Sequence, residues 1–341
     1  MAKLILDFEN NEYYIGSRSQ DVDYSGIQGV SNVKDALDYI IGQIGEGGGS
    51  TPLSNHLNIL ILGNSYSCDS FGYLPFILKA YGITVTVGIY VRPGGTLNLL
   101  YSEYATAQGA FFFIDTRTDL YWTQPTSPGP KGLVQYAHNN NFHWDMIVMQ
   151  QASSDAVTGT TFSHAEDIVK LINADMDGSY VLGWNINHTR KKNIDGNVDE
   201  SLDNPSAVLA NCADVCESLP VDIVFPYGTA IFNARQNQTL AALGGGGNLW
   251  SYDMVHLNEG FPCYLANLAT AEALFKKFYP QFSVLGDRNY ATSDWVADNH
   301  ISVTIDRVGS PTNADFSATN CYLAQKAAIM AVRNPFEITT I

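Results

Sequence analysis

Three side chains that could act together as nucleophile, base and orienting acid lie in two short motifs of this chain. Ser65 closes a Gly-Asn-Ser motif directly after the apolar run 57–62, which is typical of a buried strand. Asp253 and His256 form an Asp-x-x-His motif about 190 residues further along. A serine hydroxyl is a weak nucleophile until a neighbouring base takes its proton, and a carboxylate can orient that base. The residue types and their order therefore indicate a Ser-His-Asp hydrolase.

Each motif also has an ordinary structural interpretation. A serine that follows a strand is often a helix N-cap or part of a turn. Asp253 and His256 could both be surface residues before a helix predicted to start at Phe261. Ser67 and Ser70 are further candidate nucleophiles, although the Gly-Asn pair directly precedes Ser65 alone. The occurrence of both motifs in one chain favours the catalytic interpretation.

The two motifs, in this order, resemble the first and last blocks of the SGNH (GDSL-like) hydrolase family. The segments LILGNSYSCDSFGYLPFILKAYG, VGIYVRPGG and DMIVMQQASSDA resemble a bacterial and phage branch of that family, and the resemblance covers roughly residues 57–280. It implies a serine esterase that needs no metal or cofactor, with Ser65 as nucleophile, His256 as general base and Asp253 as the acid that orients it. It also implies ester substrates, among which acetyl groups on carbohydrates are frequent in the family.

Donors for the negative charge that develops on the substrate oxygen are less clearly marked. The N–H of Ser65 is one candidate, and the family's second block implies that Gly95 donates a second N–H. The third block usually contains an Asn, where this chain has Gln150 and Gln151. A glutamine amide carries the same donors on a longer stem. We therefore predict that Gln151 completes the oxyanion site, with Gln150 as the second choice.

The alternation of strand-like and helix-like segments predicts the fold class. Strands are expected at 57–62, 84–91, 145–150, 180–185 and 221–225, and helices at 73–81, 164–174, 206–217, 261–278 and 318–332. Residues 111–115 and 120–123 predict an inserted antiparallel hairpin, and 301–305 predict an exposed strand. This alternation indicates an α/β protein with a doubly wound, mainly parallel sheet in a three-layer α/β/α sandwich.

The N-terminal part is predicted to be separate from that sandwich. Residues 1–44 form an expected attachment segment, 45–56 a Gly-rich linker, and 57–341 the hydrolase-like domain. Apolar residues at helical spacing between residues 33 and 44 predict a helix that is too short to be stable alone, so it needs a partner surface.

The segment 21–38 resembles a short module of bacteriophage tail and fibre proteins. That resemblance implies trimerisation through residues 1–44, a place on a virion and contacts with other virion proteins. The alternative is an ordinary helix docked on the main domain. A second function stays open as well, namely a virion structural or glycan-binding protein that keeps the hydrolase fold without turnover.

Composition restricts the partners and the compartment. The chain has 341 residues and a net charge of −16, which argues against nucleic acid as a partner. Its five cysteines lack the spacing of a disulfide framework, so they are predicted to be reduced and mostly buried. No apolar signal segment and no run of membrane-spanning length is seen, so a location in the cytoplasm is expected unless the protein is carried on a virion.

No metal site is predicted from the sequence. Residues 173–178 begin like a calcium loop, but its twelfth position is Trp184, which supplies no oxygen ligand.

Overall fold

The computed structural model describes residues 4–8, 11–15, 55–118, 121–140, 142–159, 162, 164–176, 178–192, 197–243, 248–250, 253–285 and 313–341. The chain divides into two units, Met1–Pro52 and Leu53–Ile341. In the first unit, β1 (Leu4–Phe8) and β2 (Asn11–Ile15) pair antiparallel, a hairpin that the sequence prediction does not include. The expected helix between residues 33 and 44, the segment 21–38, most of the linker and the expected strand 301–305 lie outside the described residues.

The second unit is built around a six-stranded sheet with the strand order β5-β4-β3-β6-β7-β8. Its strands are β3 (His56–Gly63), β4 (Thr84–Val91), β5 (Ala110–Asp115), β6 (Met146–Gln150), β7 (Val181–Asn185) and β8 (Ile223–Phe225). Every neighbouring pair is parallel except β4 and β5, which confirms the predicted mainly parallel sheet. The predicted hairpin is correct only in part, because β5 pairs along its length with β4 and meets Thr123 through a single bridge at Phe113.

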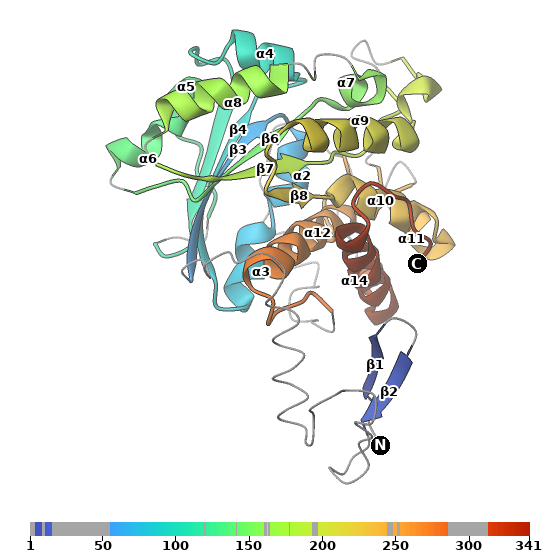
Figure 1. Cartoon of the computed structure of the whole chain (residues 1–341). Helices are drawn as coiled ribbons and strands as arrows, with labels where there is room; N and C mark the ends of the chain where they lie inside the picture. Colours follow the sequence, from blue (N-terminus) through green and yellow to red (C-terminus); the bar gives the residue numbers. More distant parts are fainter. Residues whose placement is uncertain are drawn as a thin grey trace. The chain divides into compact units, whose positions relative to one another are not determined.

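Helices cover both faces of this sheet, which gives the predicted three layers (Figure 1). One face packs against α4 (Leu97–Ser102), α5 (Gly129–Val134), α7 (Ser153–Thr158), α8 (His164–Asp175) and α9 (Pro205–Ser218). The other packs against α2 (Tyr66–Phe71), α3 (Leu74–Ala80), α10 (Tyr227–Arg235), α12 (Phe261–Phe278) and α14 (Ala318–Arg333). Short helices α6 (Tyr136–Asn139), α11 (Gln238–Ala241), η1 (Glu200–Leu202) and η2 (Asn313–Phe316) connect them.

The alternation of side chains along β3 explains how one apolar run serves both layers. Ile59 and Ile61 join the core beneath α2 and α12, whereas Leu60 and Leu62 join the core beneath α8 and α9. All four side chains are fully buried. A parallel strand covered on both faces must be apolar at every position, which is why the run lacks a polar face.

The order of the parallel strands reverses between β3 and β6. The chain proceeds from β3 outward to β4 and then crosses back to β6, β7 and β8 on the other side. In open α/β sheets, ligands bind in the crevice at the carboxyl ends of the strands at such a reversal. Ser65 follows β3 and Gln151 follows β6, so both lie at this point.

Several helices that begin at this edge are missing from the sequence prediction, α2 and α10 among them. Every residue of α2 is buried, as is every residue of α10 except Arg235. A helix that is buried on all sides has no solvent-exposed face, so its sequence lacks the apolar stripe opposite a solvated face by which helices are recognised.

The described cysteines agree with the prediction of reduced thiols. None of the five is part of a disulfide, and only Cys216 is partly exposed. Burial raises the pKa of the Cys212 thiol to about 12, so this side chain behaves as a small apolar group. None of the described helices combines the length and the apolar character that a membrane crossing requires.

Candidate active site

Ser65 lies in the tight connection between β3 and α2, at the N-cap position of that helix. Its side chain makes no capping hydrogen bond, and its Oγ lies 2.7 Å from Nε2 of His256. The preceding Gly63 is required by space, since a Cβ there would meet the Ser67 hydroxyl and come within 3.3 Å of the Gln150 Cβ. Ser65 therefore occupies the N-cap position without capping the helix through its side chain, and its hydroxyl instead faces the imidazole.

The other two candidate serines are engaged elsewhere. Ser67 Oγ donates to Gln150 Oε1 at 3.2 Å, and Ser70 Oγ donates to the Tyr66 carbonyl at 3.2 Å. Both are fully buried, whereas Ser65 keeps 7% exposure. Ser65 is therefore the serine of this helix that combines a base with access from solvent.

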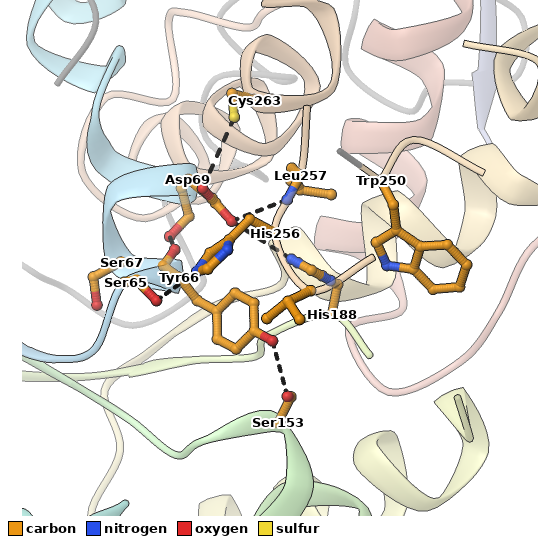
Figure 2. Close-up of polar contacts among 12 residues, drawn as sticks. Ser65, Tyr66, Ser67, Asp69, Ser153, His188, Trp250, His256, Leu257 and Cys263 are labelled. Carbon is orange, nitrogen blue, oxygen red and sulfur yellow. Dashed lines mark hydrogen bonds and ion pairs between the residues drawn. The ribbon is translucent and has the colours of Figure 1, made fainter. Parts of the chain in front are cut away.

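His256 and Asp253 meet across a sharp turn. His256 Nδ1 lies 2.6 Å from Asp253 Oδ2, and Asp253 Oδ1 accepts the N–H groups of Val255 at 2.8 Å and His256 at 2.9 Å. Met254 has a φ of +55°, which tightens the chain between them. An ionised carboxylate can only accept, so we assign the hydrogen to Nδ1, and Nε2 then presents its lone pair to Ser65. Figure 2 shows this contact between Ser65 and His256.

The three predicted residues thus form one continuous line of hydrogen bonds across 191 positions of sequence. Ser65 and His256 are each 7% exposed, and the Asp253 side chain is 24% exposed. The site is therefore mostly dry but open to solvent at the carboxylate end of the line.

The predicted oxyanion donors differ in their surroundings. Among the described residues, no acceptor takes the N–H of Ser65, so this donor is available. The N–H of Gly95 donates to the Arg92 carbonyl at 2.7 Å, in a turn closed by Pro93 and by Gly94 with a φ of +61°. The geometry therefore does not support Gly95 as an oxyanion donor, because its N–H already has an acceptor.

The two glutamines after β6 have different surroundings. Gln151 is fully buried, and its Oε1 accepts the N–H groups of Leu97 and Ala152, both at 2.9 Å. Because its oxygen is held there, the donating NH2 end of the amide faces away from those backbone groups. Gln151 is thus held by the backbone of the loops after β4 and β6, and its role as an oxyanion donor stays a prediction.

Gln150 is part of the structural framework. Its Nε2 donates to Asn64 Oδ1 at 2.8 Å, and its Oε1 accepts from Asn185 Nδ2 at 2.6 Å. Asn64 Nδ2 in turn donates to the Gly95 carbonyl at 2.9 Å. The second choice of Gln150 is therefore not supported, and Asn64 emerges as the residue that joins the loops after β3, β4 and β6.

A second Asp–His pair lies behind the first. Asp69, one turn along α2 from Ser65, has its Oδ2 3.6 Å from Nε2 of His188, and both side chains are fully buried. Asp69 Oδ2 also accepts the N–H of Leu257 at 3.3 Å, the residue directly after His256 (Figure 2). Burial lowers the pKa of His188, an effect that the nearby Asp69 opposes.

Tyr66 packs against both imidazoles. Its ring lies 4.7 Å edge-on from His188 and 5.5 Å from His256, and its hydroxyl lies 3.0 Å from Ser153 Oγ. Sequence reasoning missed Asp69 and His188 as parts of the site because they belong to no short spacing motif, whereas Tyr66 was considered only as an aromatic ring that could stack on a sugar. The available signal was their place in the sequence. Tyr66 and Asp69 lie one and four residues after Ser65, and His188 lies three residues after the end of β7. Residues that closely follow the strands gather at the carboxyl edge of the sheet.

The loop after β7 is held in place by Arg235, whose side chain keeps 9% exposure. Arg235 stacks 4.0 Å from the Trp250 ring and donates through Nη1 to Thr189 Oγ1 at 3.1 Å. Burial lowers the pKa of this guanidinium to about 10, while Asp203, at 3.7 Å, opposes that effect. Trp250 Nε1 donates to the Thr189 carbonyl at 3.1 Å, so the loop and the residues before the Asp-x-x-His turn are fixed together.

The fold and the site together define an α/β protein with a Ser–His–Asp line at the carboxyl edge of its sheet. The chain belongs to the DUF4886 family, described as a domain of unknown function, whose model matches residues 58–299.

Two solved structures are similar to this chain. A DUF4886 family protein from Bacteroides uniformis ATCC 8492 has a TM-score of 0.61 at 20% identity, covering 84% of this chain and 98% of its own. A candidate SGNH hydrolase from Slackia heliotrinireducens has a TM-score of 0.40 at 18% identity, covering 64% of this chain and 99% of its own. None of the curated proteins compared with this chain matches it. The first likeness shows the fold, and the second defines neither fold nor function.

Proposed function

We propose that this protein is a serine ester hydrolase in which Ser65, His256 and Asp253 form the catalytic triad. The observation that carries the proposal is the line from Ser65 Oγ through His256 to Asp253, with separations of 2.7 Å and 2.6 Å. Such a line activates a serine hydroxyl, and it lies at the edge of the sheet where α/β folds bind ligands.

The reaction follows from the donors and acceptors of this line. Ser65 Oγ attacks the ester carbonyl carbon while His256 Nε2 takes the hydroxyl proton, and Asp253 stabilises the resulting imidazolium. The tetrahedral oxyanion is bound by the Ser65 N–H and the Gln151 amide. His256 returns the proton to the departing alcohol, which leaves an acyl group on Ser65. A water molecule, deprotonated by His256, then releases the acid and restores the hydroxyl.

The finer assignment rests on the resemblance to SGNH hydrolases and on its Gln-Gln branch. From this resemblance we propose that the natural substrates are carbohydrates that carry ester-linked acyl groups, most often acetyl groups. The place on a phage virion and trimerisation through residues 1–44 also stay proposals. Sedimentation of the full chain checks the latter, since a monomer at micromolar concentration would contradict it.

The primary test is hydrolysis of 4-nitrophenyl acetate by the parent and by Ser65→Ala and His256→Ala. We expect a loss of at least about 10³-fold in kcat/KM in both variants. Ser102→Ala is a matched control, because Ser102 is an exposed serine of α4. A fluorophosphonate should label the Ser65 peptide in the parent and in the control variant, and mass spectrometry of the digest locates the label.

If the parent shows no hydrolysis and no labelling while it is folded, the esterase proposal is wrong. The alternative of a structural or glycan-binding protein would then take its place.

A further inference from the structure

Arg190 follows the buried His188 in the loop after β7, and no carboxylate among the described residues pairs with it. The chain carries 18 Lys and Arg against 34 Asp and Glu, so an unpaired arginine is unusual here. Its neighbours in the same region are paired, with Lys191 Nζ 3.1 Å from Glu200 and Arg235 Nη1 3.7 Å from Asp203. Among the described residues, Arg190 forms no ion pair, and its Nε is shielded from solvent without a hydrogen-bond acceptor.

The backbone on both sides of Arg190 is fixed to the catalytic elements. On one side, the Thr189 carbonyl faces His188 Nδ1 at 2.6 Å and accepts from Trp250 Nε1 at 3.1 Å. On the other side, the N–H of Lys191 donates to the Met254 carbonyl at 2.9 Å, inside the Asp-x-x-His turn. Arg190 therefore projects from a rigid point between the buried pair and the catalytic turn.

The charge of Arg190 acts on the immediate surroundings of Ser65. It opposes the rise in the pKa of the buried Tyr66 hydroxyl, whose main cause is burial. Tyr66 directly follows Ser65, and its hydroxyl meets Ser153, which lies two residues after Gln151. This electrostatic effect agrees with the backbone geometry, in which the residue after Arg190 is hydrogen-bonded to the Asp-x-x-His turn at Met254.

A shielded N–H without an acceptor is costly, and a bound oxyanion would supply that acceptor. A guanidinium offers parallel N–H donors that match a carboxylate, and its charge makes those hydrogen bonds stronger. The net charge of −16 repels anions at long range, so an anionic ligand needs a local cation of this kind.

We propose that Arg190 binds a carboxylate of the substrate next to the ester that Ser65 attacks. This inference rests on the proposed function of Ser65, and it adds the substrate class: an ester that carries a negative charge on its acyl or its alcohol part. The acidic net charge is compatible with a neutral or cationic substrate but identifies none, whereas Arg190 favours an anionic substrate locally.

The test compares matched pairs of esters. Mono(4-nitrophenyl) succinate and its neutral succinamate differ in charge on the acyl side, and 4-acetoxybenzoate and 4-acetoxybenzamide differ on the alcohol side. We expect the parent to prefer the anionic member of one pair by about 10-fold or more in kcat/KM. Arg190→Gln should remove that preference and change the neutral ester less than about threefold. Lys192→Gln, a neighbouring cation of the same loop, is the matched control and should keep the preference.

The outcomes separate this inference from the proposed function. If neutral esters are hydrolysed through Ser65 but neither anionic ester is preferred, or Arg190→Gln keeps the preference, the role of Arg190 is wrong and the esterase stands. If no ester is hydrolysed, calorimetry of monoethyl succinate binding decides. Weaker binding by Arg190→Gln than by the parent supports the anion site without the esterase, and equal or absent binding overturns it.

Discussion

The two Asp–His pairs of this protein contain the same chemical groups in different settings. Asp253 and His256 are 2.6 Å apart on one turn, near solvent, and their imidazole faces a serine hydroxyl. Asp69 and His188 are 3.6 Å apart, come from α2 and from the loop after β7, and have no exposure. Among the described residues, His188 Nε2 has no hydrogen-bond partner.

The difference shows that location decides whether such a pair can transfer protons. A general base must gain and lose a proton during turnover, and burial disfavours the charged imidazole. Burial lowers the pKa of His188, so this imidazole is poorly suited to take a proton. Asp69 instead connects the helix that carries Ser65 to Leu257, directly after the base. We therefore expect the exposed pair to control the rate and the buried pair to control stability and alignment.

Replacing each of the two histidines separately should give the largest difference in kcat. His256→Gln should lower kcat at least about 10³-fold, because no base remains for Ser65. His188→Gln should lower kcat less than about 10-fold, since this side chain faces no reacting group. Initial rates with 4-nitrophenyl acetate, together with thermal melting of both variants, check this. Equal losses in two folded variants would erase the distinction between the pairs.

The two aspartates should differ in the same way, so that replacing Asp253 lowers kcat more than replacing Asp69. Asp253→Asn should lower kcat by about 10²- to 10⁴-fold, because the amide can hold the imidazole in the wrong tautomer. The KM should change little, since Asp253 contacts His256 and its own turn. Steady-state kinetics separate the two parameters, and an unchanged kcat would show that Asp253 does not orient the base.

Removing the buried carboxylate should act first on stability. Asp69→Ala leaves the buried N–H of Leu257 without its side-chain acceptor, which costs about 1–3 kcal/mol in the free energy of unfolding. Asp69→Asn keeps an acceptor of the same shape and should lose less. Urea unfolding of both variants measures the difference, and Asp69→Ala with the parent's stability would exclude the anchoring role.

The smallest expected effect is a pH dependence of stability that comes from His188. Its folded pKa lies below the unfolded value near 6.5, so protons bind more readily to the unfolded chain below that pH. The stabilisation is complete above pH 6.5 and decreases as the pH falls below it, by at most about 1.4 kcal/mol per pH unit.

Urea unfolding at pH 7.5 and pH 5.5 measures this loss for the parent and for His188→Gln. The variant should lose less stability than the parent over this interval. A larger loss in the variant would mean that His188 is charged in the folded protein, held by Asp69.

Several features could be predicted because their causes are local. The apolar runs predict β3, β4, β6 and β7, and the 18-residue helix α12 follows from its own composition and bounds. The contact of Asp253 with His256 also follows from sequence, since a spacing of three within one turn lets the side chains meet.

The sequence by itself determined which residue types were available and which short motifs hold them. Only the tertiary structure brought Ser65 to His256 and engaged the N–H of Gly95 in a turn. It also separated the roles of Gln150 and Gln151, and it paired Asp69 with His188. These contacts join elements far apart in the chain, and their geometry depends on how α2 and the edge loops pack around the sheet. No local spacing encodes that packing, because a fully buried helix such as α2 has no solvent-exposed face and therefore no apolar stripe to mark it in the sequence.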